Sequence, residues 1–217
     1  MHGILWGADK FYQVYGMTEA GPTGTTLYPR DQVRKAGSIG KSALPGADLQ
    51  VMKNETEPAA SGETGEIWLK ADSMMTGYYN DPAATAQAFA GGWYRTGDVA
   101  RVDEDGFLYI VDRLKDMIVT GGENVYSKEV EDAIAVHPGV VESAVIGRPH
   151  HEWGETVVAF VISKANVDLK VEELKGFLSG KMAQYKIPRE FRIVSELPHT
   201  PTGKVKKFEL RRQLDNL

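Results

Sequence analysis

The chain contains no cysteine, no long apolar run and no excess of positive charge, and each absence excludes a class of function. Without cysteine there can be no disulfide, no thiolate metal site and no cysteine nucleophile. No apolar stretch approaches the roughly 20 residues that span a bilayer, so we expect no integral membrane segment. The 30 acidic residues outnumber the 25 basic ones, which gives a net charge of -5. That balance argues against a nucleic-acid partner, because such binding uses basic surface to neutralise phosphates.

Length and composition are those of an ordinary globular protein. The 217 residues allow one large or two modest domains, each with its own core. The first ten residues lack the basic segment and apolar run of a signal peptide, so we expect a cytoplasmic protein.

The first half of the chain predicts short strands joined by loops. Residues 22–65 are rich in Gly, Pro, Thr and Ser, with a strand expected at 48–52. Alternating apolar and polar residues predict a strand at 65–70. An Asp cap, a Pro and a Gly-Gly stop predict a short helix at 81–92. Two β-rich runs around an Asp-Gly turn predict a hairpin at 98–113.

A different pattern begins after the charged run DRLKD at 112–116. A strand is followed by a helix that we expect Ser127 to cap, then by two strands and a second helix. The sequence therefore predicts an α+β protein, with a β-rich domain over residues 1–112 and a small α/β domain over residues 113–217. The second helix carries an apolar face formed by Val171, Leu174, Leu178 and Met182.

The loop VYGMTEA at residues 14–20 combines an aromatic ring, a glycine, a hydroxyl and a carboxylate. Glu19 is a hard oxygen ligand suited to Mg²⁺, which takes one or two carboxylates in addition to substrate phosphates. Thr18 can donate a hydrogen bond to a phosphate oxygen, and Tyr15 offers a flat face to a purine. Taken alone, the motif is as well explained by a polar turn after a buried strand.

Several polar or glycine positions elsewhere could also serve a ligand. Asp98 begins a hairpin strand, where a carboxylate could accept both hydroxyls of a ribose, and Arg113 could donate to the same sugar. Lys204 follows a glycine that permits a tight turn and would present a point charge. Gly121 and Gly122 could admit a thin ligand against bare backbone. Taken alone, each of these residues is more often part of a turn or a solvated surface charge than a ligand contact.

The order and spacing of these motifs resemble the adenylate-forming superfamily of acyl-CoA synthetases, peptide-synthetase adenylation domains and luciferases. The resemblance covers nearly the whole chain and rests on YGMTEAGPTG, GWYRTGDVARVDEDGFLYIVDRLKDMIVTGGENVYSKEVE and LPHTPTGKVKK. The central stretch is more similar to the acyl-CoA synthetases. The resemblance implies a β-rich, distorted-barrel remnant of a large N-terminal domain, then a hinge and a small mobile C-terminal domain.

The same resemblance implies an AMP-forming acid–CoA ligase that uses ATP, Mg²⁺ and coenzyme A. Such an enzyme converts a carboxylic acid and ATP to an acyl-adenylate and pyrophosphate. The thiol of CoA then displaces AMP to give a thioester. Fatty acids are the default substrate class, and aryl acids stay open because the acyl pocket is expected in other residues.

The resemblance assigns the VYGMTEA loop to the nucleotide. Tyr15 would stack on adenine, Gly16 would belong to the same binding loop, Thr18 would contact phosphate and Glu19 would hold Mg²⁺. Thr18 and Glu19 are thereby also candidate catalytic residues.

It assigns Asp98 and Arg113 to the ribose and Lys204 to catalysis. Lys204 would bridge the acid carboxylate and the α-phosphate, stabilising charge as the adenylate forms. Lys115 corresponds to the hinge about which the small domain turns between the two half-reactions.

Coenzyme A is assigned to the small domain. Gly121 and Gly122 would line the pantetheine tunnel, and Trp153 and Tyr185 fall where relatives use aromatic rings against the CoA adenine. The two aromatic residues are equally compatible with simple packing.

The chain departs from the family pattern in three places. Ser127 stands where many synthetases have proline, and Ile187 replaces a basic residue that some relatives offer to a CoA phosphate. The family's phosphate loop, of the kind TSGTTGxPK, has no counterpart before YGMTE. We therefore expect the chain to be the C-terminal part of a longer synthetase and to be nearly inactive alone.

Other hypotheses stay open. A chain without the phosphate loop could be a non-catalytic module that binds adenylate or CoA, or the partner of a separate N-terminal chain. The peptide-synthetase branch is disfavoured by the stretch GGENVYS. An incompletely covered apolar face over residues 1–36 could also drive homodimerisation.

Overall fold

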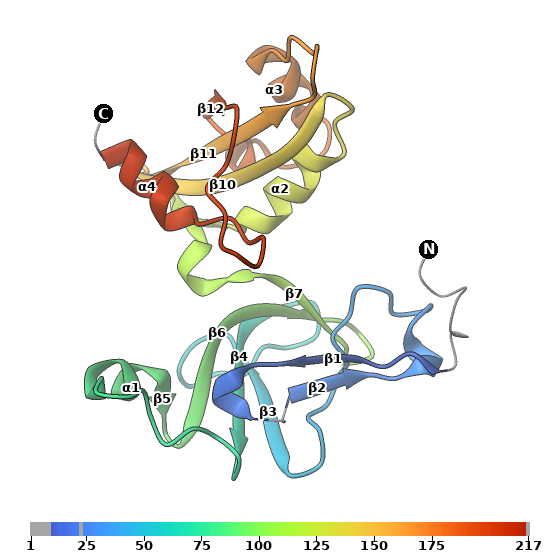
Figure 1. Cartoon of the computed structure of the whole chain (residues 1–217). Helices are drawn as coiled ribbons and strands as arrows, with labels where there is room; N and C mark the ends of the chain where they lie inside the picture. The colour runs from blue at the N-terminus through green and yellow to red at the C-terminus, as the bar shows by residue number, and fades with distance from the viewer. Residues whose placement is uncertain (1–9, 22–23, 216–217) are drawn as a thin grey trace. The chain divides into compact units, whose positions relative to one another are not determined.

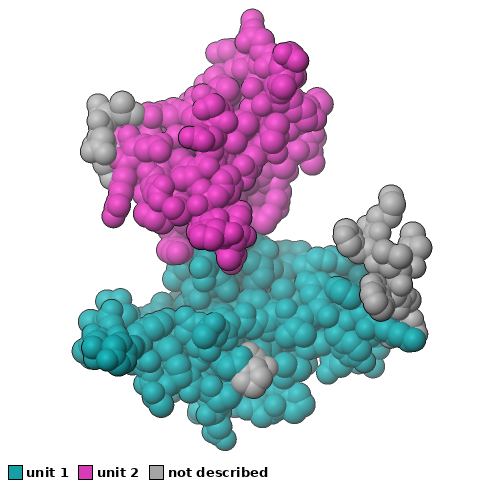
Figure 2. Space-filling model, viewed as in Figure 1, with its two compact units in different colours: residues 1–114 teal, residues 115–217 magenta. Residues whose placement is uncertain are grey.

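The computed structural model describes residues 10–21 and 24–215. The chain forms two compact units, Met1–Leu114 and Lys115–Leu217, which Figure 2 shows in different colours. The division lies two residues beyond the boundary expected from the sequence.

Unit 1 is built mainly from antiparallel strands (Figure 1). Its elements in chain order are β1 (Gln13–Gly16), the 3-10 turn η2 (Thr18–Ala20), β2 (Gly24–Leu27), the 3-10 turn η3 (Pro29–Asp31), β3 (Ala47–Met52), β4 (Thr64–Ala71), α1 (Pro82–Ala88), β5 (Phe89–Ala90), β6 (Trp93–Val102) and β7 (Leu108–Arg113).

The sheets of unit 1 explain how distant residues meet. Five strands form one sheet in the order β3-β4-β6-β5, with β7 also paired to β6, and β1 and β2 form a separate ribbon. Isolated bridges Thr25↔Ala43 and Gly40↔Leu108 join the ribbon to β7 through the intervening segment. The expected distorted barrel is therefore an open sheet within the described residues, because β3 and β5 each pair with one other strand only.

Helix α1 begins as its sequence predicts and ends earlier. The Asp81 carboxylate accepts the backbone N–H of Ala84 at 2.9 Å, and a proline follows the cap. The helix was expected to continue to residue 92, but residues 89–90 pair with β6 across a turn at Gly91 and Gly92. Both glycines have positive φ angles of 56° and 83°, as a tight hairpin turn requires.

Unit 2 alternates strands and helices. Its elements are η4 (Leu114–Asp116, shared with unit 1), β8 (Ile118–Thr120), β9 (Glu123–Val125), α2 (Ser127–Ala135), β10 (Val140–His150), β11 (Gly154–Ser163), α3 (Val171–Ser179), the 3-10 turn η5 (Gln184–Lys186), β12 (Glu190–Ile193) and α4 (Lys207–Asp215).

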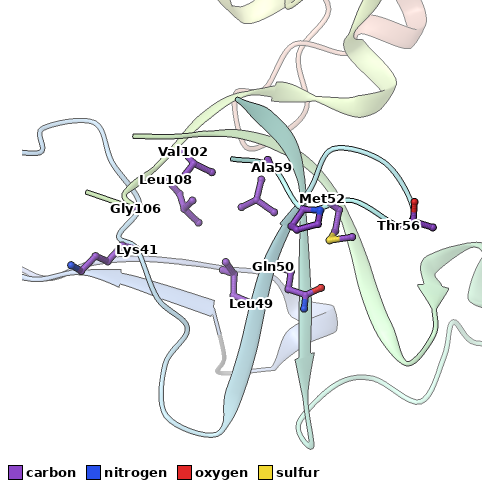
Figure 3. Close-up of a pocket in the computed structure, with 11 residues that line it drawn as sticks. Lys41, Leu49, Gln50, Met52, Thr56, Ala59, Val102, Gly106 and Leu108 are labelled. Carbon is purple, nitrogen blue, oxygen red and sulfur yellow. The ribbon is translucent and has the colours of Figure 1, made fainter. Parts of the chain in front are cut away.

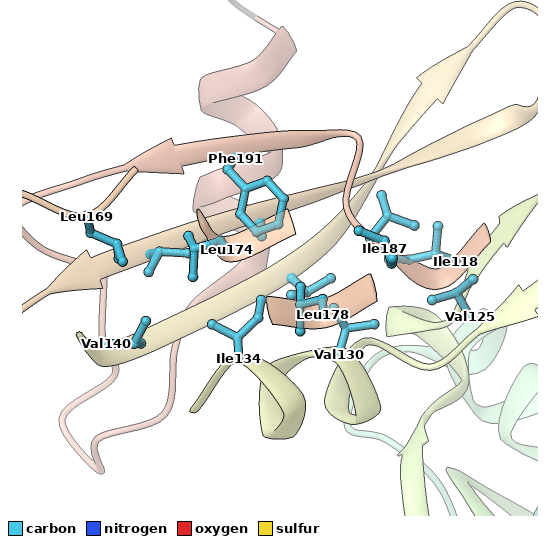
Figure 4. Packing of buried hydrophobic residues seen from close by; sticks show 14 residues of the cluster. Ile118, Val125, Val130, Ile134, Val140, Leu169, Leu174, Leu178, Ile187 and Phe191 are labelled. Carbon is cyan, nitrogen blue, oxygen red and sulfur yellow. The ribbon is translucent and has the colours of Figure 1, made fainter. Parts of the chain in front are cut away.

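Strands β10 and β11 of unit 2 are buried on both faces, so their apolar runs fill two cores. The sheet order is β10-β11-β8-β9, with β12 parallel to β11. Val145 and Val157 belong to one core. Figure 4 labels Ile134 of α2 and Leu174 of α3 in the same core. Ala144 and Val158, the adjacent positions, belong to the other core with residues of α4. This alternation is what a strand with period-two side chains produces between two covered faces. The α+β class predicted from the sequence is confirmed.

The structure differs from the sequence-based expectations at the start of α2 and the end of α3, and one further expectation falls partly outside the described residues. Ser127 does not cap α2: Tyr126 holds the N-cap position, and the buried Ser127 hydroxyl accepts Lys207 Nζ at 2.6 Å. Helix α3 ends at Ser179, and Met182 packs on the core beyond it. The apolar face expected over residues 1–36 lies partly outside the described residues.

The helices of the described residues are short. The longest helices of the described residues have nine residues, and none is long and apolar enough to cross a bilayer.

Candidate functional site

Three residues predicted to bind the nucleotide meet in unit 1. Tyr15 Oη donates to Asp98 Oδ2 at 2.8 Å, and Arg113 Nε donates to Asp98 Oδ1 at 2.9 Å. Asp98 and Arg113 lie opposite each other in the β6–β7 ladder, whereas Tyr15 comes from β1. The fold thus brings together side chains that are up to 83 positions apart in the sequence.

The Asp98 carboxylate is held in a defined position. Its side chain is 15% exposed, while that of Arg113 is 54% exposed. The Asp98 N–H donates to Thr96 Oγ1 at 3.0 Å, and the Thr96 hydroxyl donates to the Ile67 carbonyl at 2.8 Å. A carboxylate offers about four lone-pair positions, so Asp98 retains capacity to accept ligand hydroxyls.

Tyr15 is a protonated hydrogen-bond donor in this cluster. Burial raises the pKa of its hydroxyl, and the adjacent Asp98 carboxylate raises that pKa further. The ring packs at the edge of the unit 1 core. Because its hydroxyl is anchored, the ring is held rigidly, and stacking of adenine on it stays a prediction.

Glu66 supports the segment that leads to Asp98, a role that sequence reasoning missed. Its buried carboxylate accepts the Gly97 N–H at 3.0 Å, Arg95 Nε at 3.1 Å and Trp68 Nε1 at 2.9 Å. The residue stands in a strand with no motif around it, so no local pattern indicated this role.

Thr18 and Glu19 form the turn after β1. Thr18 is exposed and Glu19 is half-buried. The Glu19 carbonyl accepts the Met75 N–H at 2.8 Å, and its carboxylate accepts Tyr78 Oη at 3.2 Å. Gly16 precedes the turn and pairs with Gly24, where a side chain would collide with the Tyr15 carbonyl at 1.9 Å. The strand therefore approaches its neighbour over bare backbone.

Two tyrosines, Tyr78 and Tyr94, adjoin this turn, and neither was singled out from the sequence. Tyr78 Oη lies 3.4 Å from Tyr94 Oη as well as against Glu19. Burial raises the pKa of Tyr94, with smaller contributions from Tyr78 and Glu19, so the Tyr94 hydroxyl remains protonated.

The donor set at Glu19 fits Mg²⁺. No group of three or more His, Cys, Asp or Glu residues gathers among the described residues, so no all-protein metal cage exists there. A single carboxylate beside an exposed hydroxyl is what Mg²⁺ uses when substrate phosphates and water supply its other ligands. The assignment of the ion to Glu19 stays a proposal.

Lys204 lies at the end of a turn that is closed by its own hydrogen bonds. Lys204 N–H donates to Thr200 Oγ1 at 3.0 Å, and the Thr200 N–H donates to the Lys204 carbonyl at 2.8 Å. Gly203 has a φ of 82°, which favours glycine. Lys204 is exposed, and no carboxylate within residues 10–21 and 24–215 lies within ion-pair distance of its ammonium.

Lys115 lies in η4, where the division between the units falls. Its carbonyl accepts Arg211 Nη2 at 3.3 Å, and the same nitrogen donates to the buried Asp116 carboxylate at 2.9 Å. Helix α4 therefore fixes the first residues of unit 2, directly after the position predicted as a hinge.

Trp153 and Tyr185, both predicted to bind CoA, line one groove of unit 2. The groove has a volume of about 800 Å³ and is also lined by Lys175, Gln184 and Arg189. Its open shape and two cationic residues suit an extended anionic ligand.

The predicted glycine turn adjoins the same groove. Gly121 N–H donates to the Trp153 carbonyl at 2.8 Å, and Gly121 and Gly122 have φ angles of 60° and 83°. The Arg189 guanidinium lies 3.8 Å from the centre of the Trp153 ring and donates to Thr120 Oγ1 at 3.1 Å. Arg189 was not singled out from the sequence, where it follows a proline with no motif.

A further groove in unit 1 contains none of the predicted site residues. Figure 3 shows its lining, which is mostly apolar and includes Lys41, Gln50 and Thr56 as polar members. Its volume is about 480 Å³.

Two protein-family models match parts of the chain that contain residues of these clusters. A model of the AMP-binding enzymes matches residues 3–79, and a model of the AMP-binding enzyme C-terminal domain matches residues 129–204. The chain belongs to the AMP-binding, adenylate-forming enzymes. The first match contains the VYGMTEA turn, and the second contains the Trp153 groove and ends at Lys204.

Individual adenylate-forming relatives match over nearly the whole chain. The chain is 43% identical over 201 residues to the 2-succinylbenzoate–CoA ligase of Geobacillus kaustophilus, covering 93% of this chain and 41% of that relative. It is 42% identical over 201 residues to a long-chain-fatty-acid–CoA ligase of Mycobacterium tuberculosis, covering 93% and 39%. ATP-bound MatB from Rhodopseudomonas palustris matches with a TM-score of 0.84 at 37% identity, covering 94% and 41%. The chain thus spans about two fifths of the length of these relatives.

Proposed function

We propose that this chain is the C-terminal part of an AMP-forming acid–CoA ligase. The observation that carries the proposal is the Tyr15–Asp98–Arg113 cluster, in which a mostly buried carboxylate is fixed beside an aromatic ring and a cation. That arrangement suits a ribose with an attached base and phosphate. The CoA-ligase names of the matched relatives support the same reaction class.

In the first half-reaction, a carboxylate oxygen of the acid forms a bond to the α-phosphorus of ATP, and pyrophosphate leaves. Asp98 would accept the ribose hydroxyls and Thr18 would donate to a phosphate oxygen. The exposed ammonium of Lys204 would stabilise negative charge between the carboxylate and the α-phosphate. Glu19 would hold Mg²⁺, which neutralises phosphate charge when it is bound.

In the second half-reaction, the CoA sulfur forms a bond to the acyl carbon and AMP leaves. We assign CoA to the groove of Trp153 and Tyr185, where Arg189 and Lys175 supply positive charge for its phosphates. The Gly121–Gly122 turn would border the pantetheine arm. Rotation of unit 2 about Lys115 would exchange Lys204 for this turn between the half-reactions.

The proposal also includes the class of carboxylic acid that the enzyme activates. Relatives of nearly equal identity are named for succinylbenzoate and for long-chain fatty acids, so the match alone does not select between them. We propose a fatty acid as the substrate. A panel of fatty and aryl acids, compared by kcat/KM on the longer enzyme that contains this chain, tests it, and a preference for aryl acids of at least tenfold would overturn it.

A fusion enzyme tests the proposed function. The part of the Geobacillus relative that precedes its match to this chain is joined to the first matched residue of this chain, and the fusion is given acid, ATP and CoA. We expect acyl-CoA with AMP and pyrophosphate as co-products. Formation of ADP, or ATP binding without any acyl product while the parent relative is active under the same conditions, would contradict the proposal.

Replacing Trp153 by Ala should weaken CoA binding to the 217-residue chain by about tenfold. The ring lines the groove and also orders Arg189 by a 3.8 Å contact, so its loss removes both a wall of the groove and the support of a cation. Titration calorimetry with CoA measures the change. Tyr79→Ala is the matched control, because Tyr79 is 93% exposed and lies in the other unit. Equal affinities of the native chain and Trp153→Ala would remove this groove as the CoA site.

A further inference from the structure

The turn that carries Lys204 is a small, separately closed structure. Gly203 N–H donates to the Thr200 carbonyl at 2.9 Å, and the Thr200 hydroxyl lies 2.9 Å from that of Thr202. Together with the two Thr200–Lys204 hydrogen bonds, these contacts fix the backbone within the turn. They do not fix the turn to the rest of unit 2.

One end of the turn is attached to the sheet through His199. His199 Nε2 and Glu142 Oε1 lie 2.9 Å apart, and His199 forms a β-bridge with Val205 across the base of the turn. Glu142 stands in β10 directly after an irregularity in its pairing with β11, between Val140 and Glu142. Such irregularities can redirect a side chain. Here the Glu142 side chain leaves β10 toward His199 at the base of the turn.

The other end is attached to helix α2 by Lys207. Lys207 Nζ contacts Ser127 Oγ at 2.6 Å and Glu131 Oε1 at 2.7 Å. Lys206 pairs with Glu209 at 3.0 Å within its own segment, so that contact does not tie the turn to the sheet. The turn is thus held at both ends. On the side that leads into Thr200, Leu197 packs in the core shared with α4, and the His199–Glu142 contact is the polar attachment nearest to Thr200.

We propose that His199 is a positioning residue, whose ion pair with Glu142 holds the Lys204 turn in place for acyl-adenylate formation. The inference rests on the proposed role of Lys204. It adds a residue and a partner carboxylate that act through the turn and do not touch the substrate.

The charge state of His199 gives this attachment a pH dependence. The hydrogen bond to Glu142 raises the pKa of His199, with a further contribution from the Leu197 carbonyl and an opposing one from burial. Glu142 is the charged group among the described residues that acts on the ring. Because the folded-state pKa is raised, the ion pair is complete in mildly acidic solution and is lost as pH rises through that pKa.

Amide hydrogen exchange in the full 217-residue chain tests the attachment. The measured quantity is the exchange rate of the Lys206 amide, which donates to the Pro198 carbonyl at 2.7 Å at the base of the turn beside His199. The rate in Glu142→Gln is divided by the native rate at the same pH, which cancels the intrinsic pH effect. We expect a ratio of about five at pH 5.5, since both side chains are partly exposed, and a ratio near one at pH 9. His199→Lys should keep native protection at pH 5.5 and exceed it at pH 9, because its cation persists.

Glu209→Gln is the matched control, because it removes a neighbouring ion pair that does not reach the sheet, and it should leave the ratio at one. A ratio of one for Glu142→Gln at pH 5.5, or the same ratio at both pH values, would overturn the proposal. So would a failure of His199→Lys to retain protection at pH 9.

Adenylation by the fusion enzyme separates this inference from the proposed function. We expect Glu142→Gln to lower kcat of ATP–pyrophosphate exchange about fivefold with an unchanged KM for ATP, and His199→Lys, which can still pair with Glu142, to retain native kcat. If Lys204→Ala leaves adenylation intact, the role of Lys204 is wrong. If Lys204→Ala abolishes adenylation and Glu142→Gln has native kcat, only the positioning role is wrong.

Discussion

Replacing Lys204 by Ala should lower the rate of acyl-adenylate formation in the fusion enzyme by about 100- to 1,000-fold. The exposed ammonium stands at the end of a rigid turn and would act as a fixed point charge where negative charge develops. Transfer of a pre-formed acyl-adenylate to CoA should change less than about threefold, because Lys204 is proposed to act only in the first step. ATP–pyrophosphate exchange and acyl transfer, measured separately, give the two rates.

Lys206→Ala is the matched control for this substitution. It removes a lysine two positions away that pairs with Glu209, and both half-reactions should remain near native. Equal losses in the two half-reactions of Lys204→Ala would contradict the role assigned to this residue.

Replacing Asp98 by Asn should weaken AMP binding to the fusion enzyme by about 30-fold. The amide has nearly the same shape as the carboxylate, but it carries no charge and loses acceptor positions to its NH₂ group. Tyr15, whose raised pKa keeps its hydroxyl protonated, and Arg113 would then compete with the ribose for one remaining oxygen. Calorimetry with AMP measures the loss.

Asp105→Asn provides the comparison, since Asp105 stands at the turn of the same hairpin and pairs with Lys35. Its AMP affinity should match that of the native protein. Native affinity in Asp98→Asn, with a folded spectrum, would show that the ribose binds elsewhere.

Local patterns predicted much of the fold, because the spacing of apolar residues differs between strands and helices and can be read from neighbouring residues. The hairpin of β6 and β7 and the apolar face of α3 follow from such patterns. Helix α4 was not predicted: its segment KFELRRQLD is strongly charged, and Leu210 and Leu214 give a weak apolar signal four residues apart. The cap of α2 was assigned wrongly because Ser127 is a good capping residue that here serves Lys207 instead.

The site was predictable only as a set of residue types. The motifs indicated Tyr15, Asp98 and Arg113 separately. No local sequence pattern predicts that a tyrosine in β1 contacts a carboxylate in β6. The same holds for Arg189 on Trp153 and for His199 on Glu142. These contacts depend on sheet topology and strand register, which join residues that are distant in the sequence.

The most direct test of the account is a single-turnover measurement on the fusion enzyme with labelled ATP and no CoA. The account predicts that acyl-adenylate and pyrophosphate form together on the enzyme, up to one equivalent. Adding CoA should then convert the acyl-adenylate to acyl-CoA and release AMP. Bound ATP that gives no acyl-adenylate, while the parent relative forms it under the same conditions, would contradict the claim that this chain supplies the adenylation machinery.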